Sequence, residues 1–361
     1  MKSSNVLKGA AAAVARCAGQ AHADVSIMYA DGLASLVEPG IAAYEEKTGE
    51  TVEAIKLPGE GYVERVALDL ASGTAADVIQ MDSFVVSELA SAGYVGSLDD
   101  MLAGWDQYQY YLKGLTDVVS YNGNVYALPT DTDVRMLWYS VPVMEKAGIA
   151  LPWEPKSWDD VLDAARKIKE TGIEDAFALP AGTKRGEATT MQGFYMALLG
   201  ADVPEDGRNR LRDWDAGKWV GDSPAIRRTL ELYKTIYIDE ELGTQSLHYT
   251  GDVDSNIRAA LRDGTIGIVA SGSWENGCIF DCEGTDIPQA ERDALVNWTP
   301  WPGSGVEGAM ETTNISGGWA IGVNESASDK DAAFDLLTTI VDYGNFQEWT
   351  VDNGRMAVRT D

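Results

Sequence analysis

Four charged residues in this sequence are suited to hydrogen bonding with a polyhydroxylated molecule. Asp82 follows a short apolar run, and Asp131, Asp133 and Arg135 stand together between two apolar runs. Carboxylates accept hydrogen bonds from hydroxyl groups and a guanidinium donates several in a fixed fork, so this set can satisfy both sides of a hydroxyl. Which of Asp131 and Asp133 faces inward stays open, and Arg135 could instead form a structural ion pair with one of them. Asp82 could equally serve as an acceptor at a helix entry near Ser83.

Two tryptophans stand where a side chain should project from the fold. Trp274 follows the Ser-Gly-Ser segment 271–273, and Trp319 follows the pair Gly317-Gly318. An indole face packs well against the C–H patches of a sugar ring, while the sugar hydroxyls take polar partners around its edge. Trp301, which stands between two prolines, is a third candidate. Other tryptophans are expected to be core residues: Trp105, Trp214, Trp219 and Trp349.

The elements that position these residues alternate between strands and helices. Apolar runs predict strands over residues 25–29, 52–55 and 78–81. The helices between and after them are expected to end at three glycines that can take a left-handed conformation: Gly49, Gly73 and Gly93. This alternation predicts a largely parallel sheet covered by helices on both faces. Ligands of such sheets bind beyond the carboxyl ends of the strands, which is where Asp82 lies.

A second α/β unit is predicted after residue 131. The pair Asn122-Gly123 predicts a hairpin turn, and the chain then passes through Pro129 and the polar cluster 130–133 into this unit. Its first helix begins with a capping box at Ser157 and Asp160, and 266–270 is expected to be a buried strand. A second crossing is expected at Gly317-Gly318. A helix over 329–341 should then return to the first unit.

Seven segments of the chain, in order, resemble those of one protein family. They include the crossing at 121–139, the helix end at 43–49, the strand and following block at 76–82 and 89–99, and the segments 155–160, 264–274, 315–319 and 354–359. Together they are similar to the bacterial extracellular solute-binding proteins of the sugar-binding, maltose-binding-protein-like kind. The resemblance implies an α/β fold with two lobes, each a mostly parallel sheet flanked by helices, joined by hinge crossings.

The resemblance also implies the domain limits and the role. Residues 24–130 and 320–354 would form the first lobe, and 131–319 with 355–361 the second. Relatives continue past 354–355 with helices that close the second lobe, so a sequence that ends at Asp361 is expected to be either truncated or abbreviated in this lobe. A monomer of this kind would capture a carbohydrate between its lobes and deliver it to the permease subunits of an ABC importer. Neither catalysis nor a cofactor is expected.

Several site residues follow from the same resemblance. Asp82 matches the sugar-binding aspartate of the first lobe, and Trp274 and Trp319 match positions that commonly stack on sugar. Arg355 matches a position that can reach the ligand, and Gly318 lies in the second crossing. Further candidates lie on loops of the first lobe: Tyr29, Asp31, Glu60 and Tyr62.

Composition limits the alternatives. A chain of 361 residues exceeds one ordinary core and should form about two domains. No apolar run approaches the roughly 20 residues that a membrane span needs. The net charge of −29 becomes more negative, −32, if residues 1–23 with their three basic side chains are removed. Nucleic acid and anionic membranes are therefore poor partners.

The N-terminus has the pattern of a secretory signal. Lys2 and Lys8 precede an Ala-rich run, and Ala21-His-Ala23 provides an A-x-A cleavage site, which predicts a periplasmic or extracellular protein. Cys17 suggests lipoprotein anchoring, but Arg16 before it fits a lipobox poorly. In an exported protein, Cys278 and Cys282 are expected to form a small disulfide rather than a metal site.

Two other functions remain open. Paired carboxylates and tryptophan platforms also build the sites of secreted glycoside-active enzymes, although no acid/base pair stands apart here. The negative charge would also suit a polyamine or another cationic solute, whereas the two projecting tryptophans favour a sugar or polyol.

Overall fold

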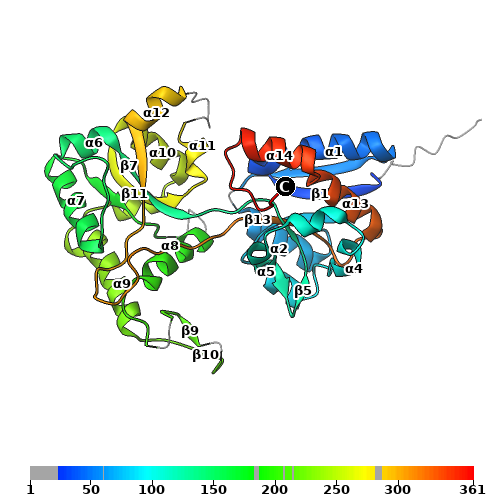
Figure 1. Ribbon diagram of the computed structural model, residues 1–361, viewed down its shortest axis with the longest axis horizontal. Helices are drawn as coiled ribbons and strands as arrows, with labels where there is room; N and C mark the ends of the chain where they lie inside the picture. Colours follow the sequence, from blue (N-terminus) through cyan, green and yellow to red (C-terminus); the bar gives the residue numbers. More distant parts are fainter. Residues whose placement is uncertain (1–22, 60, 183–186, 206–207, 214, 281–286) are drawn as a thin grey trace, which may run out of the picture.

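The computed structural model describes residues 23–59, 61–182, 187–205, 208–213, 215–280 and 287–361, and it has two lobes (Figure 1). The expected signal, residues 1–23, lies outside this description except for Ala23, as do Glu60 and Cys282, so the structure does not test the cleavage site or the disulfide. No helix in the described ranges is long and apolar enough to cross a membrane.

The first lobe is built on a five-stranded sheet in the order β2-β1-β3-β13-β6. Its strands are β1 (Val25–Ala30), β2 (Val52–Leu57), β3 (Val78–Asp82), β6 (Leu128–Pro129) and β13 (Trp319–Val323). β1 pairs in parallel with β2 and β3, whereas β13 is antiparallel to both β3 and β6. Four of the five strands therefore run in the same direction, which agrees with the expectation of a mostly parallel sheet, and β13 is the exception. The reason is that β13 enters from the second lobe, so it starts at the edge of the sheet where β3 ends.

The second lobe contains a four-stranded sheet in the order β12-β7-β11-β8. Its strands are β7 (Arg135–Ser140), β8 (Asp175–Ala178), β11 (Ile266–Gly272) and β12 (Val296–Pro300). β8, β11 and β12 run in the same direction, and β7 is antiparallel to both of its neighbours. β7 begins directly after the first crossing between the lobes, and β13 begins directly after the second.

Helices cover both sheets. The first lobe has α1 (Ala34–Thr48), α2 (Tyr62–Ser72), α3 (Val86–Ser91), α4 (Asp99–Leu102), α5 (Lys113–Val118), α13 (Lys330–Ile340) and α14 (Tyr343–Asp352). The second has α6 (Val141–Lys146), α7 (Trp158–Glu170), α8 (Glu187–Leu199), α9 (Pro224–Lys234), α10 (Val253–Asp263), α11 (Glu275–Cys278) and α12 (Gln289–Leu295). Each lobe has its own buried apolar clusters, one with Leu137 and Ile268 in the second lobe and one with Ile27 and Ile321 in the first.

Local signals account for many of these boundaries. Gly49 and Gly73 end α1 and α2 with positive φ angles of 77° and 71°, as predicted. Asn122 and Gly123 have φ angles of 50° and 86° and join the short hairpin strands β4 (Ser120–Tyr121) and β5 (Asn124–Val125). The Ser157 hydroxyl accepts the backbone N–H of Asp160, which confirms the predicted cap of α7.

The helix after β3 has no side-chain cap, because α3 begins at Val86 and its N-cap residue makes no side-chain hydrogen bond. Instead the Ser83 backbone N–H donates to the carbonyl of Gly318 in the second crossing. On α9, Leu230 is 54% exposed.

The last residues of the chain belong to the first lobe, not to the second as expected. Val358 is fully buried within the apolar cluster of the first lobe, and its carbonyl accepts the backbone N–H of Leu112. The Arg359 guanidinium donates to the carbonyl of Val341 at 2.7 Å. In Figure 1 the C-terminus accordingly lies beside α14 and β1.

Candidate functional site

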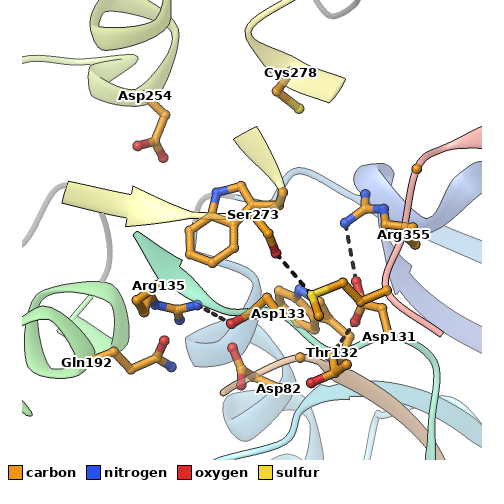
Figure 2. A pocket seen from close by; sticks show the side chains of 16 residues that line it. Asp82, Asp131, Thr132, Asp133, Arg135, Gln192, Asp254, Ser273, Cys278 and Arg355 are labelled. Carbon is orange, nitrogen blue, oxygen red and sulfur yellow. Dashed lines mark hydrogen bonds and ion pairs between the residues drawn. The ribbon is translucent and has the colours of Figure 1, made fainter. Parts of the chain in front are cut away.

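A cavity of about 310 Å³ lies between the lobes. First-lobe elements contribute Gly59, Asp82 and Trp319, whereas second-lobe elements contribute Gln192, Asp254, Ser273, Trp274 and Cys278. The two crossings and the C-terminal segment supply Asp131, Thr132, Asp133, Arg135, Gly318, Gly354, Arg355 and Met356. Figure 2 shows these side chains around the opening. A molecule held here would contact both lobes, and the volume is at the lower end of that of small-molecule sites.

Asp82 ends β3 and faces the cavity, as its place at the carboxyl end of a strand predicted. Its carboxylate accepts the backbone N–H of Phe84 at 3.4 Å, the one hydrogen bond to it from the part of the chain that the structure describes. The pKa of Asp82 is raised to about 7, mainly by burial; the Phe84 N–H opposes this shift, and the nearby Asp133 carboxylate adds to it. The site therefore holds a carboxyl group that changes its charge near neutral pH.

Asp131 joins the two crossings to the C-terminal segment. One carboxylate oxygen accepts the backbone N–H of Trp319 at 2.8 Å, and the other accepts the guanidinium of Arg355 at 3.2 Å. Burial raises the pKa of Asp131 to about 6, against the opposing effects of Arg355 and the Trp319 N–H. Arg355 thus lines the cavity as its resemblance implied, with its charge balanced by Asp131.

Asp133 forms the ion pair with Arg135 that the sequence left open. The Asp133 carboxylate accepts hydrogen bonds from the Arg135 guanidinium and from the backbone N–H of Gly317, the latter at 3.1 Å. Burial raises the pKa of Asp133, and Arg135 opposes the shift. The same guanidinium lies 4.3 Å from the ring centroid of Trp274, within the range of a cation–π interaction. Asp133, Arg135 and Trp274 therefore form one packed group in the second lobe.

Tyr62 was expected to contact the ligand, but it instead supports the side chain of Trp319. Its side chain is 1% exposed, and its hydroxyl donates to the carbonyls of Met28 and Gln80, which lie 3.0 Å away. The Tyr62 ring meets the Trp319 indole edge-on, with the ring centroids 5.9 Å apart. This aromatic contact holds the Trp319 indole at the start of β13, where it faces the cavity.

Two glycines make room for this arrangement. Gly318 has a φ angle of 137°, and a Cβ atom there would lie 2.2 Å from the carbonyl oxygen of Asp131. Gly272, at the end of β11, packs under the Trp274 ring, since a Cβ atom would come within 1.8 Å of Cζ3. The second crossing was expected at Gly318, but neither its close approach to Asp131 nor the role of Gly272 was predicted.

Three further expectations are corrected. Trp301 is 1% exposed and packs near Phe177 in the core of the second lobe, so it is not a ligand platform. Trp219, expected in a core, is 72% exposed. Tyr29 is 1% exposed within β1, so it does not line the cavity.

Some lining residues were not predicted at all. Gln192 and Asp254 come from α8 and α10, and Ser273 and Met356 face each other across the lobes with the hydroxyl 3.6 Å from the sulfur. Gln192 and Asp254 follow neither a crossing nor a predicted strand end, so only the packing of α8 and α10 brings them to the cavity. Within the described ranges, no group of three His, Cys, Asp or Glu side chains could hold a metal ion.

Comparisons of sequence agree with this architecture. The family model for bacterial extracellular solute-binding proteins matches residues 29–343. A lactose-binding protein of Rhizobium radiobacter is 22% identical over 317 residues, which are 83% of this chain and 64% of that protein. A putative binding protein of Brucella abortus is 23% identical over 254 residues, which are 65% of this chain and 57% of the relative. The chain thus spans less than two thirds of the length of these curated relatives.

Comparisons of structure confirm the two-lobed α/β fold. A solute-binding protein of Thermotoga lettingae TMO bound with α-D-tagatose is 25% identical, with a TM-score of 0.78 and coverage of 93% of this chain and 81% of that chain. A solute-binding protein of Agrobacterium vitis S4 with bound D-mannitol is 19% identical, with a TM-score of 0.69 and coverage of 91% and 75%.

Proposed function

Because the chain belongs to the family of bacterial extracellular solute-binding proteins, we propose that it captures a carbohydrate or polyol in the cavity between its lobes. The loaded protein would then present this ligand, outside the cytoplasm, to the permease subunits of an ABC importer. The relatives named for lactose, α-D-tagatose and D-mannitol are consistent with a ligand of this class.

The observation that carries the proposal is the placement of two indoles and a carboxyl group around one cavity. Trp319 and Asp82 come from the first lobe, opposite each other in paired strands, and Trp274 comes from the second lobe. Indole faces bind the C–H surface of a sugar ring, and a carboxylate accepts its hydroxyls. A ligand that contacts both lobes stabilises the closed arrangement, so binding shifts the population of conformers toward it.

The rival functions are weaker on the same geometry. A glycoside-active enzyme needs one carboxyl group as acid and another as base or nucleophile. Asp131 and Asp133 are each paired with a guanidinium, which leaves Asp82 and Asp254, from different lobes, as the lining carboxyl groups for these two roles. A polyamine would find four lining carboxylates against two guanidinium groups, but a polyamine has no ring to stack on the indoles.

The test is a thermal-shift screen with D-tagatose, D-mannitol, lactose, maltose and spermidine, followed by calorimetry of each hit. A ligand present at about 100 times its Kd stabilises the folded protein by about 2.7 kcal/mol. We expect a saccharide or polyol hit that is recovered chemically unchanged after incubation. Products of cleavage would support the enzyme, and a response to spermidine alone would support a cation-binding protein.

A further inference from the structure

The polar groups that line the cavity are not equally available to a ligand. Asp131 accepts from Trp319 and Arg355, and Asp133 accepts from Arg135 and Gly317. These carboxylates therefore already have donors from the protein. A ligand that used them would have to compete with charge-assisted hydrogen bonds, which are roughly twice as strong as neutral ones.

Gln192 is in the opposite situation. It lies on α8 in the second lobe, and its side chain is directed into the cavity (Figure 2). Its Oε1 atom is buried and accepts no hydrogen bond from the part of the chain that the structure describes. A buried acceptor without a donor destabilises a protein, because it has lost its hydrogen bonds with water. Such a group is usually retained where a water or a ligand provides the missing donor.

The backbone beside Gln192 is held in place, while its amide can turn. Gly193, the next residue, packs against the ring of Pro180, and a Cβ atom there would lie 3.3 Å from it. The bond that carries a glutamine amide has a broad, roughly two-fold torsional profile, so the amide reorients at small cost. The helix thus fixes the position of the side chain, and rotation of the amide presents its oxygen or its NH₂ group to the cavity.

We infer that Gln192 is the residue of the second lobe that selects the ligand, because its amide oxygen takes a hydrogen bond from one hydroxyl of the bound saccharide or polyol. This inference rests on the proposed function and adds to it a requirement on the ligand. The ligand must carry a free hydroxyl on the side that faces α8, and a deoxy or O-methylated derivative at that position is rejected. Asp82 accepts a hydrogen bond from the ligand on the side of the first lobe, so a ligand bound to both groups bridges the lobes.

The test compares Gln192→Leu with Gln347→Leu, which makes the same chemical change at an exposed position of α14 away from the cavity. Calorimetry with the hits among D-tagatose, D-mannitol, lactose and maltose measures Kd, first for the parent compounds and then for their monodeoxy derivatives. We expect Gln192→Leu to raise Kd about tenfold or more and Gln347→Leu to leave it unchanged. One monodeoxy derivative should bind the wild-type protein about tenfold more weakly than its parent compound. The Gln192→Leu variant should bind that derivative and the parent compound with the same Kd.

A second measurement needs no ligand. If the Gln192 oxygen is kept for a ligand, Gln192→Leu removes an unsatisfied group, so the urea midpoint of the ligand-free protein stays the same or rises. A lower midpoint would show a structural role and overturn the inference, as would an unchanged Kd in Gln192→Leu. If the wild-type protein binds none of the four compounds, the proposed function fails; an unchanged or higher midpoint then still supports Gln192 as a ligand-binding group, and a lower one overturns it.

Discussion

The carboxylate of Asp131 accepts the backbone N–H of Trp319 at 2.8 Å, although the two residues are 188 positions apart in the chain. Asp131 follows β6 in the first crossing, and Trp319 begins β13 after the second. This hydrogen bond therefore ties the two crossings together at the floor of the cavity. Because the second carboxylate oxygen accepts the Arg355 guanidinium, one side chain sets the position of both an indole and a positive charge that face the ligand.

Substitution of Asp131 should separate its two roles. Asp131→Ala leaves the Trp319 N–H and the Arg355 guanidinium without their acceptor, and we expect a loss of about 3 kcal/mol in the free energy of unfolding. Asp131→Asn keeps an acceptor for the N–H and has no charge to desolvate, so it should cost clearly less than Asp131→Ala. Urea denaturation at pH 8 measures both. Equal losses for the two variants would show that the N–H bond contributes little.

Trp319 should contribute to affinity more than to folding. Trp319→Ala removes the stacking surface, and we expect Kd for a bound saccharide to rise about thirtyfold, which corresponds to about 2 kcal/mol. Trp319→Phe, which retains an aromatic face, should lose less. Trp219→Ala is the control, because this indole is 72% exposed and lies outside the residues that line the cavity. An affinity unchanged in Trp319→Ala would contradict the proposed stacking.

Short-range signals explain which parts of the fold could be predicted from the sequence. The glycines that end α1 and α2, the Asn122-Gly123 turn and the cap at Ser157 each depend on a few neighbouring residues. Asp82 could be placed for a similar reason, because the end of a strand in an α/β sheet is a common ligand position. The direction of β13 could not, since it depends on how the chain returns from the other lobe.

Two features of the cavity could not be predicted from the sequence: which charged residues pair with each other, and which helix residues line it. Arg355 pairs with Asp131 across 224 positions, whereas Arg135 pairs with Asp133 two positions away, and the residue types alone allow either arrangement. Tyr62, expected on a loop, begins α2 and is buried in the core of the first lobe. Gln192 had no local signal, since only the packing of α8 brings it to the cavity.

The crossing at Gly317-Gly318 offers a matched pair of substitutions. A Cβ at Gly318 would collide with the Asp131 carbonyl and would stand at a φ angle of 137°, so Gly318→Ala should lower the free energy of unfolding by about 2 kcal/mol or more. A Cβ at Gly317 would lie 3.3 Å from the Asp133 carboxylate, whose side chain can shift. Gly317→Ala should therefore cost clearly less. Thermal and urea unfolding compare the two, and equal losses would refute the steric argument.

Asp82 should make stability depend on pH in a defined direction. Its pKa is raised to about 7 in the folded protein, against an ordinary value of about 3.9 in an unfolded chain. Between these values the folded state binds more protons than the unfolded state, so the contribution of Asp82 to stability is fully present below about pH 4 and is lost as the pH rises to 7. Asp131, whose pKa is raised to about 6, acts in the same direction over a narrower range.

Asp82→Asn isolates this contribution, because asparagine has a similar shape and does not titrate. We expect the variant to be more stable than the wild-type protein at pH 8, by at most about 4 kcal/mol, with the difference shrinking as the pH falls toward 4. Urea unfolding at pH 5, 6, 7 and 8 measures it, and a difference that does not vary with pH would contradict the assignment.

Binding should also release protons near pH 7, because a ligand hydroxyl that donates to Asp82 favours the ionised form of this carboxyl group. Calorimetry in buffers of different ionisation enthalpy measures that release, and proton uptake would mean that Asp82 is buried by the ligand without receiving a hydrogen bond from it.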